Sequence, residues 1–187
     1  MATGSVSPRR ADTRRNHERF LAAAAEALRR TGEVSFNAIA KQAGVGVGTV
    51  YRHFPAPEDL ILAVYRREVR HLVDIVPTLL KRHPPDQAFR FWVVDHLAHY
   101  MMTKRGLTTA LRAIPSELPA RTYESMLDAL DTLRKANVEA GMIRADLTAE
   151  TLMRGLGGLL FLDPEGDWKA ETKTLVDLLW RGMRAEG

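Results

Sequence analysis

Four neighbouring residues near the end of the first third of the chain carry side chains suited to phosphate and base edges. They are Thr49, Tyr51, Arg52 and His53. Hydroxyl, guanidinium and imidazole groups donate hydrogen bonds to phosphate oxygens and to bases in the DNA grooves. Gly48 precedes them and costs a helix roughly 1 kcal/mol relative to Ala, a cost that a close approach to a groove or phosphate would justify. The pattern favours nucleic-acid binding over catalysis.

A helix ahead of these side chains is predicted over residues 36–43. Ser35 is a good N-cap, because its hydroxyl can accept a hydrogen bond from a backbone N–H in the first turn. The apolar face of this helix recurs at helical spacing and consists of Phe36, Ile39, Ala40 and Ala43. Gly44 fits the positive-φ residue that commonly ends a helix.

A second helix is predicted over residues 47–54 and would carry the polar side chains. It is too short to be stable by itself in water, so packing must hold it. Val50 and Phe54 are the expected inward residues, because they lie four positions apart. Two short helices joined by a glycine-rich turn are typical of a helix-turn-helix, which seats its second helix in the DNA major groove. Spacing alone leaves an ordinary helical hairpin with a solvated polar face as the alternative.

The positive charge of the chain is concentrated around this motif. Residues 1–54 contain nine Lys and Arg against four Asp and Glu, whereas the remainder contains eighteen against nineteen. Basic surfaces suit phosphate binding and speed the encounter with DNA. Residues 1–11 are predicted to be disordered. The basic stretch from Arg9 to Arg15 is either a tail with no specific role or an arm that crosses the DNA backbone or minor groove.

Signals for catalysis and metal binding are missing from the sequence. It holds no GxSxG, Walker, GxGxxG or HExxH motif. The glycines of residues 44–48 follow a predicted helix rather than a strand, which makes them a poor nucleotide cradle. His96 and His99, with Asp95 beside them, are too few ligands for a zinc site. We therefore expect no enzyme activity, no cofactor and no metal.

Composition indicates where in the cell the protein works. The 187 residues include no cysteine, which excludes a disulfide framework and a cysteine metal site. The sequence has no apolar run of about 18 residues that could span a membrane. Its N-terminus lacks the apolar core of a signal peptide. We expect a cytoplasmic protein without a membrane partner.

The rest of the chain is helical in pattern, and the alternation typical of strands is absent. Besides the two short helices, the predicted helices are 12–31, one from Pro57 with a break near Val76 ahead of Pro77, 86–103, 107–113, 120–140, 148–162 and 168–184. The prediction is an all-α fold of about nine helices. A three-helix, helix-turn-helix domain would occupy residues 1–54, and a larger helical domain residues 55–187.

The sequence GVGVGTVYRHF at residues 44–54 resembles the DNA-binding signature of the tetracycline-repressor (TetR) family of bacterial regulators. The signature continues with Pro55 and with Glu58-Asp59-Leu60, and the family's first helix is matched upstream by RNHERFLAAA at residues 15–24. The resemblance covers roughly Arg14 to Val64. Echoes of one actinobacterial-type subset of the family occur at residues 103–107 and 155–159.

The resemblance implies roles for individual residues of the motif. Tyr51 and His53 stand where the family holds phosphates. The positions that face the groove in the family are occupied here by Val47, Gly48, Thr49 and Arg52. Pro57 departs from the family, which often has a phosphate-binding lysine or arginine there; the contact is lost or supplied by Arg52 or Lys41. The candidate DNA-binding residues are Arg14, Arg15, Ser35, Asn37, Lys41, Gly46, Val47, Gly48, Thr49, Tyr51, Arg52 and His53.

Two tasks are expected of residues 55–187. A short turn joins the last two helices, which should therefore pack antiparallel. The resemblance implies that these two helices pair with those of a second copy of the chain. The alternative is that they only complete the core of the monomer. The helices between Pro57 and Ala140 are rich in aromatic residues and methionines, which suits an apolar pocket. In the family such a pocket binds a small, usually apolar or aromatic inducer. The weak candidates for this site are Trp92, His96, Tyr100, Arg112 and Tyr123, although for any one of them a core position is the stronger interpretation.

The expected function is that of a homodimeric transcriptional repressor, released from a palindromic operator by a small ligand. A dimer gives the motif its purpose, because two recognition helices one DNA turn apart read a palindrome. The alternatives are a regulator without a small-molecule inducer and an all-helical ligand carrier or enzyme.

Overall fold

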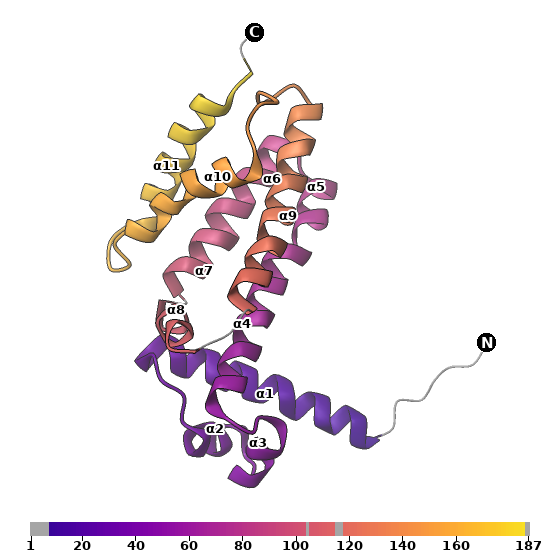
Figure 1. The fold of residues 1–187 in the computed structure, drawn as a ribbon, viewed down its shortest axis with the longest axis vertical. Helices are drawn as coiled ribbons and strands as arrows, with labels where there is room; N and C mark the ends of the chain where they lie inside the picture. The colour runs from indigo at the N-terminus through magenta and orange to yellow at the C-terminus, as the bar shows by residue number, and fades with distance from the viewer. Residues whose placement is uncertain (1–7, 104, 115–117, 186–187) are drawn as a thin grey trace, which may run out of the picture. The chain divides into compact units, whose positions relative to one another are not determined.

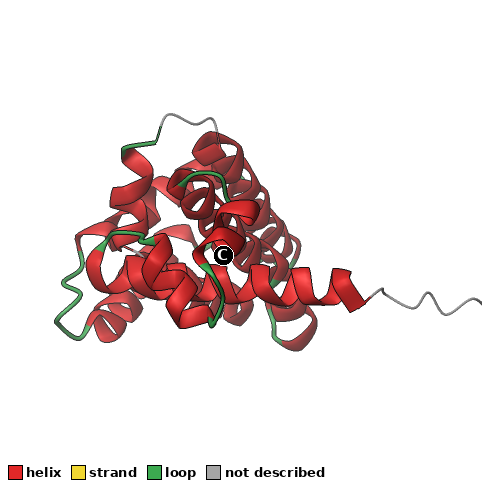
Figure 2. Cartoon of the chain, turned by 90° about the horizontal axis from the view of Figure 1, so that it is seen from below, coloured by secondary structure: helices red, strands yellow, loops and turns green. Residues whose placement is uncertain are grey.

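The computed structural model describes residues 8–103, 105–114 and 118–185 of the chain. These residues form helices joined by turns (Figures 1 and 2), and their only β-pairing is an isolated bridge between Ile143 and Arg184. The all-α prediction is confirmed. Within the described ranges, no helix is long and apolar enough to cross a membrane.

The chain divides into two compact units. The first comprises Met1–Arg66 and Lys104–Pro115, and the second comprises Arg67–Thr103 and Ser116–Gly187. The long helix α4 (Pro57–Asp74) contributes to both units.

The first unit contains α1 (Pro8–Thr31), α2 (Phe36–Ala43), α3 (Val47–His53), the start of α4 and α8 (Arg105–Arg112). Its fully buried side chains come from all five helices and include Phe20, Leu28, Ile39, Val50, Leu60 and Leu107. Helix α1 begins at Pro8, not near Asp12 as predicted, because proline is well tolerated at the first helical position. Disorder was predicted for residues 1–11; it is wrong for residues 8–11, which belong to α1, and residues 1–7 lie outside the described residues.

Helix α8 meets the end of α1 backbone to backbone. A Cβ atom added at Gly106 would lie 2.0 Å from the carbonyl oxygen of Leu28 and 3.0 Å from Cα of Gly32. Gly32 ends α1 with φ of 73°, a left-handed conformation that favours glycine. This crossing therefore depends on a glycine at position 106.

The second unit is built from the end of α4 and the remaining helices. These are α5 (Val76–Arg82), α6 (Pro85–Phe91), a π-helix (Trp92–Leu97), α7 (Ala98–Thr103), α9 (Leu118–Glu139), α10 (Ala149–Leu156), a 3-10 helix (Gly157–Phe161) and α11 (Trp168–Met183). The largest side chain of its core is Trp92, which is 0 % exposed. The Nε1–H of Trp92 donates to the carbonyl oxygen of Leu72, 2.8 Å away, so the indole joins the π-helix to α4.

The predicted helix boundaries hold in part. Each of the nine predicted helices has a counterpart among the described residues, and the predicted break near Val76 is confirmed, since it separates α4 from α5. The stretch 86–103 contains the unpredicted π-helix, whose wider turn lets Trp92, Val93, Val94 and Leu97 all be buried. The prediction that one α-helix spans 148–162 is wrong: α10 ends at Leu156 and a 3-10 helix follows, because Gly157 and Gly158 are poor helix formers.

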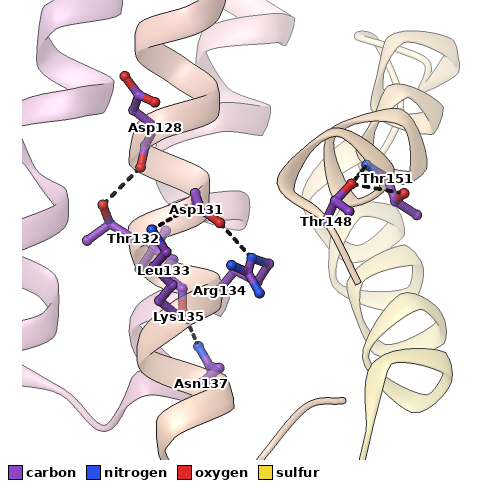
Figure 3. Close-up of polar contacts among 9 residues, drawn as sticks. All are labelled: Asp128, Asp131, Thr132, Leu133, Arg134, Lys135, Asn137, Thr148 and Thr151. Carbon is purple, nitrogen blue, oxygen red and sulfur yellow. Dashed lines mark hydrogen bonds and ion pairs between the residues drawn. The ribbon is translucent and has the colours of Figure 1, made fainter. Parts of the chain in front are cut away.

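Polar contacts along α9 and at the start of α10 are shown in Figure 3. The side-chain amide of Asn137, which is 0 % exposed, donates to the carbonyl oxygens of Leu133 and Pro85, both 2.9 Å away, and so ties α9 to α6. The ammonium of Lys135, 2.8 Å from the carboxylate of Asp131, and then Arg134, hold the pKa of that carboxyl below its usual range. Thr148 caps α10 as predicted, accepting from the backbone N–H of Thr151 at 3.2 Å.

Candidate nucleic-acid interface

Helix α2 begins and ends where its capping residues predict. Ser35 has extended backbone angles, and its hydroxyl accepts from the backbone N–H of Ala38 at 3.5 Å. Gly44 ends the helix in the left-handed region, with φ of 66°. The N–H of Val45 then bonds to the carbonyl oxygen of Ala40 at 3.0 Å, which directs the chain toward α3.

Helix α3 is held by its inward face, as predicted. Val50 is 0 % exposed and Phe54 is 4 % exposed. The backbone N–H of Phe54 closes the helix on the carbonyl oxygen of Val50 at 2.9 Å. The ring of His17, on α1, stacks on Phe54 with 5.2 Å between the ring centroids. The short helix is thus fixed by α1, which leaves its other face available.

The outward face of α3 carries a bare stretch of backbone beside a basic side chain. A Cβ atom added at Gly46 or Gly48 would meet nothing within 4 Å, so internal packing does not require glycine at either position. The guanidinium of Arg52 donates to the carbonyl oxygen of Gly48 and to the hydroxyl of Thr49, both at 3.2 Å. Arg52 therefore lies along the helix surface rather than reaching away from it.

Tyr51 and His53 flank this face in different surroundings. Tyr51 is 53 % exposed, and its ring meets the edge of Phe36 with the centroids 4.8 Å apart. His53 is half-buried and lies 5.2 Å, edge on, from the ring of Phe20. Burial lowers the pKa of His53, and the nearby His17 and Arg52 lower it further. These surroundings favour the neutral imidazole of His53 in the free protein.

The remaining candidate DNA-binding residues lie on α1 and α2. Arg14 and Arg15 are exposed on α1, where Arg15 pairs with Asp12. Asn37 and Lys41 are exposed on α2, and Val47, 37 % exposed, starts α3. The hydroxyl of Ser35 is used as the helix cap.

Two side chains of α1 that lie beside the helix-turn-helix were not among the predicted site residues. They are His17, beside His53 and Phe54, and Arg19, whose Nη2 atom is 3.6 Å from the Cβ position of Gly44. His17 and Arg19 precede the buried Phe20 by three positions and by one. This spacing could hardly have identified them as site residues, because every residue of a long helix has neighbours at such distances.

The five weak ligand-binding candidates are dispersed. Trp92 is sealed in the core, His96 and Tyr100 are half-buried, Tyr123 is 41 % exposed, and Arg112 is exposed on α8 in the first unit. The ring of His96 lies 5.5 Å from that of His71, and burial followed by His71 lowers its pKa.

Three hollows of the second unit are formed by described residues, and none of these three is lined by a ligand-binding candidate. One of about 430 Å³ lies between α6, the π-helix and α11, beside Phe91 and Lys173. An apolar one of about 260 Å³ lies between α10 and α11, beside Gly155 and Leu178. A polar one of about 330 Å³ lies between α9 and α10, beside Asp131 and Glu150.

Comparison with protein families decides the identity of the chain. Residues 20–64 match the family described as bacterial regulatory proteins, tetR family. Residues 84–185 match the C-terminal domain of SbtR-like transcriptional regulators. The chain belongs to the TetR family. It is a DNA-binding transcriptional regulator, as the helix-turn-helix motif predicted.

Relatives of this TetR-family regulator match most of its length. A TetR transcriptional regulator from Streptomyces coelicolor is 35% identical, covers 91% of this chain and 99% of its own, and superposes with a TM-score of 0.78. A TetR regulatory protein from Mycobacterium vanbaalenii is 31% identical over 95% of this chain and 100% of its own, with a TM-score of 0.76. A curated HTH-type transcriptional regulator from Staphylococcus aureus is 30% identical over 62% of this chain; the match spans 63% of that relative.

Proposed function

We propose that this TetR-family regulator binds a palindromic operator as a homodimer and is released from it by a small molecule. The observation that carries the proposal is the two-sided character of α3. Its inward face is buried through Val50, whereas Gly48, Tyr51 and Arg52 are exposed on the other side. A helix held only from within has its outer surface free to enter the major groove.

The proposed division of labour within the site follows side-chain chemistry. Tyr51 and His53 hold phosphates, and Gly48, Thr49 and Arg52 approach the bases. Arg14, Arg15, Asn37 and Lys41 add phosphate contacts from α1 and α2. Because Arg52 is tied to its own helix at 3.2 Å, it must exchange those bonds for bonds to DNA. With few base-reading side chains, the site draws part of its specificity from DNA shape.

The proposed dimer forms through α10, the 3-10 helix and α11. Figure 1 shows α10 and α11 adjacent, and the Cβ positions of Gly155 and Gly158 lie 3.3 Å from the side chains of Leu179 and Leu175. These two glycines therefore serve packing within the chain. Large apolar side chains remain exposed on the same helices, namely Leu160 (59 %), Phe161 (90 %) and Leu178 (67 %). Burying such side chains against a second copy would favour association.

We place the small-molecule site in the second unit, which makes up most of the predicted larger domain of residues 55–187. His96 and Tyr100 are half-buried there and offer polar groups at the margin of an apolar core. We do not expect Trp92 to donate a hydrogen bond to the ligand, because its indole N–H already donates to the carbonyl oxygen of Leu72. A regulator without an inducer is the second candidate.

A mobility-shift assay with DNA flanking the protein's own gene tests the operator. We expect a shifted band that resists excess unrelated DNA at moderate salt, together with a dimer mass in solution. No preference for any flanking sequence would refute the operator proposal. Screening small apolar and aromatic compounds for loss of the shift separates the two candidates.

Replacing Gly48 by alanine is expected to stabilise the protein and to weaken DNA binding. The added Cβ meets nothing within 4 Å, and alanine favours a helix by about 1 kcal/mol. On DNA, the methyl group occupies the space where α3 would approach the groove, and we expect affinity to fall by about tenfold, or about 1.4 kcal/mol. Urea unfolding and fluorescence anisotropy measure the two effects. The control is Thr132→Ala, exposed on α9, which should leave affinity unchanged.

Replacing Tyr51 by phenylalanine is expected to weaken binding to all sequences alike. The ring keeps its contact with Phe36 at 4.8 Å, so only the hydroxyl is removed. A lost phosphate contact lowers affinity uniformly, by about 1 kcal/mol for one hydrogen bond. The check is anisotropy against an operator and a set of single-base variants. A loss confined to one base position would contradict the phosphate role.

A further inference from the structure

Two histidines from different helices lie together at the edge of the candidate interface. The ring centroids of His17, on α1, and His53, on α3, are 6.2 Å apart. Both residues are half-buried. His17 stacks on Phe54 at 5.2 Å, and His53 meets the edge of Phe20 at the same distance. The aromatic residues thus fix the positions of both imidazoles.

The surroundings of His53 all oppose protonation of its ring. The charged or titratable groups that act on it among the described residues are His17 from α1 and Arg52 from α3. Both oppose its protonation, and burial opposes it more strongly. An anion brought to this place would reverse the balance, because an opposite charge within about 4–6 Å favours the protonated imidazole.

We propose that His17 and His53 together bind one backbone phosphate of DNA, and that the pair takes up a proton when it does so. Each charge-assisted N–H···O bond spans about 2.7–2.9 Å, so a phosphate seated between the two rings can accept from both. This inference rests on the DNA interface proposed above. It adds His17 as a binding residue and makes DNA affinity depend on pH.

Proton linkage predicts that a fall in pH changes DNA affinity and the stability of the free protein in opposite directions. If the complex binds more protons than the free protein and DNA, affinity rises as pH falls, by up to about tenfold per pH unit for each proton taken up. In the free protein the pKa of His53 is lowered, so the folded state binds fewer protons than the unfolded state. Its contribution to stability is therefore present above the ordinary histidine pKa of about 6.5 and is lost as pH falls below that value through the lowered pKa of the folded state. Acidification should tighten the complex while it weakens the free fold.

The test is fluorescence anisotropy with a labelled duplex from the region flanking the protein's own gene, at constant ionic strength, from about pH 8 to about pH 6. We expect affinity to rise by about tenfold across this range for the wild type. His17→Gln and His53→Gln should each flatten the profile, and the double variant should remove it. The control is His83→Gln, a half-buried histidine of the second unit that lies 4.6 Å from Phe91 and should retain the wild-type profile.

The possible results separate the two proposals. A wild type that binds with no pH dependence, or a His17→Gln variant that keeps the full dependence, overturns the histidine pair and leaves the operator proposal intact. A wild type that binds no DNA at any pH overturns both. Circular dichroism of each variant at each pH distinguishes a lost contact from a lost fold, because an unfolded variant loses helical signal. If His17→Gln unfolds, His17→Asn provides the second variant for the same comparison.

Discussion

Replacing Gly106 by alanine is expected to lower the free energy of unfolding by about 3 kcal/mol. The new Cβ would lie 2.0 Å from the carbonyl oxygen of Leu28, well inside van der Waals contact. The obstructing atoms belong to backbone, so no side chain can rotate away. That carbonyl also accepts the N–H of Gly32 at 3.0 Å, and separating α8 from α1 would disturb the end of α1. Overpacking a well-packed site typically costs 1–3 kcal/mol, and a backbone clash belongs at the upper end.

Urea unfolding followed by circular dichroism measures the effect of Gly106→Ala. The control is Gly48→Ala, where the same methyl group meets nothing within 4 Å and stability should rise instead. Equal midpoints for Gly106→Ala and the wild type would show that α8 does not pack on α1 at this distance.

Replacing Phe161 and Leu178 together by glutamate is expected to convert the proposed dimer into a monomer and to lower operator affinity by about a hundredfold or more. These side chains are 90 % and 67 % exposed in the single chain, so the change leaves the monomer's core intact. Burying an unpaired carboxylate in an apolar interface is strongly unfavourable. Loss of the dimer also removes the gain of 10²–10⁴ that linking two DNA-binding modules provides.

Sedimentation or light scattering measures the mass of this double variant, and anisotropy measures its affinity. Met142→Glu is the control, because Met142 is also exposed, at 43 %, but lies between α9 and α10. A double variant that remains dimeric would exclude α10, the 3-10 helix and α11 as the interface. A monomer that binds the operator with wild-type affinity would exclude the dimer as the DNA-binding form.

The helix-turn-helix could be predicted nearly residue by residue. The hydroxyl of Ser35 caps α2, the left-handed Gly44 ends it, and Val50 on α3 and Phe54 directly after it are buried. Each of these features depends on residues within about four positions of one another. Because these interactions are local, the order of residue types along the chain is enough to predict the helix ends and the buried positions.

Other features depend on residues far apart in the sequence, and they were missed. The contact of Gly106 with Leu28 joins positions 78 residues apart. The π-helix of residues 92–97 follows from burying Trp92 and its neighbours against α4, although the periodicity there resembles an ordinary α-helix. Arg112 was grouped with Trp92 as a ligand candidate, yet it belongs to the first unit.

The sequence by itself determined the helical class, the DNA-binding motif and the family, because these rest on short-range spacing and residue type. Only the tertiary structure decided which candidate side chains meet. It placed His17 beside His53, sealed Trp92 in the core and left Phe161 exposed. The physical reason is that propensity and capping act along a helix, whereas burial and charge depend on which helices pack together.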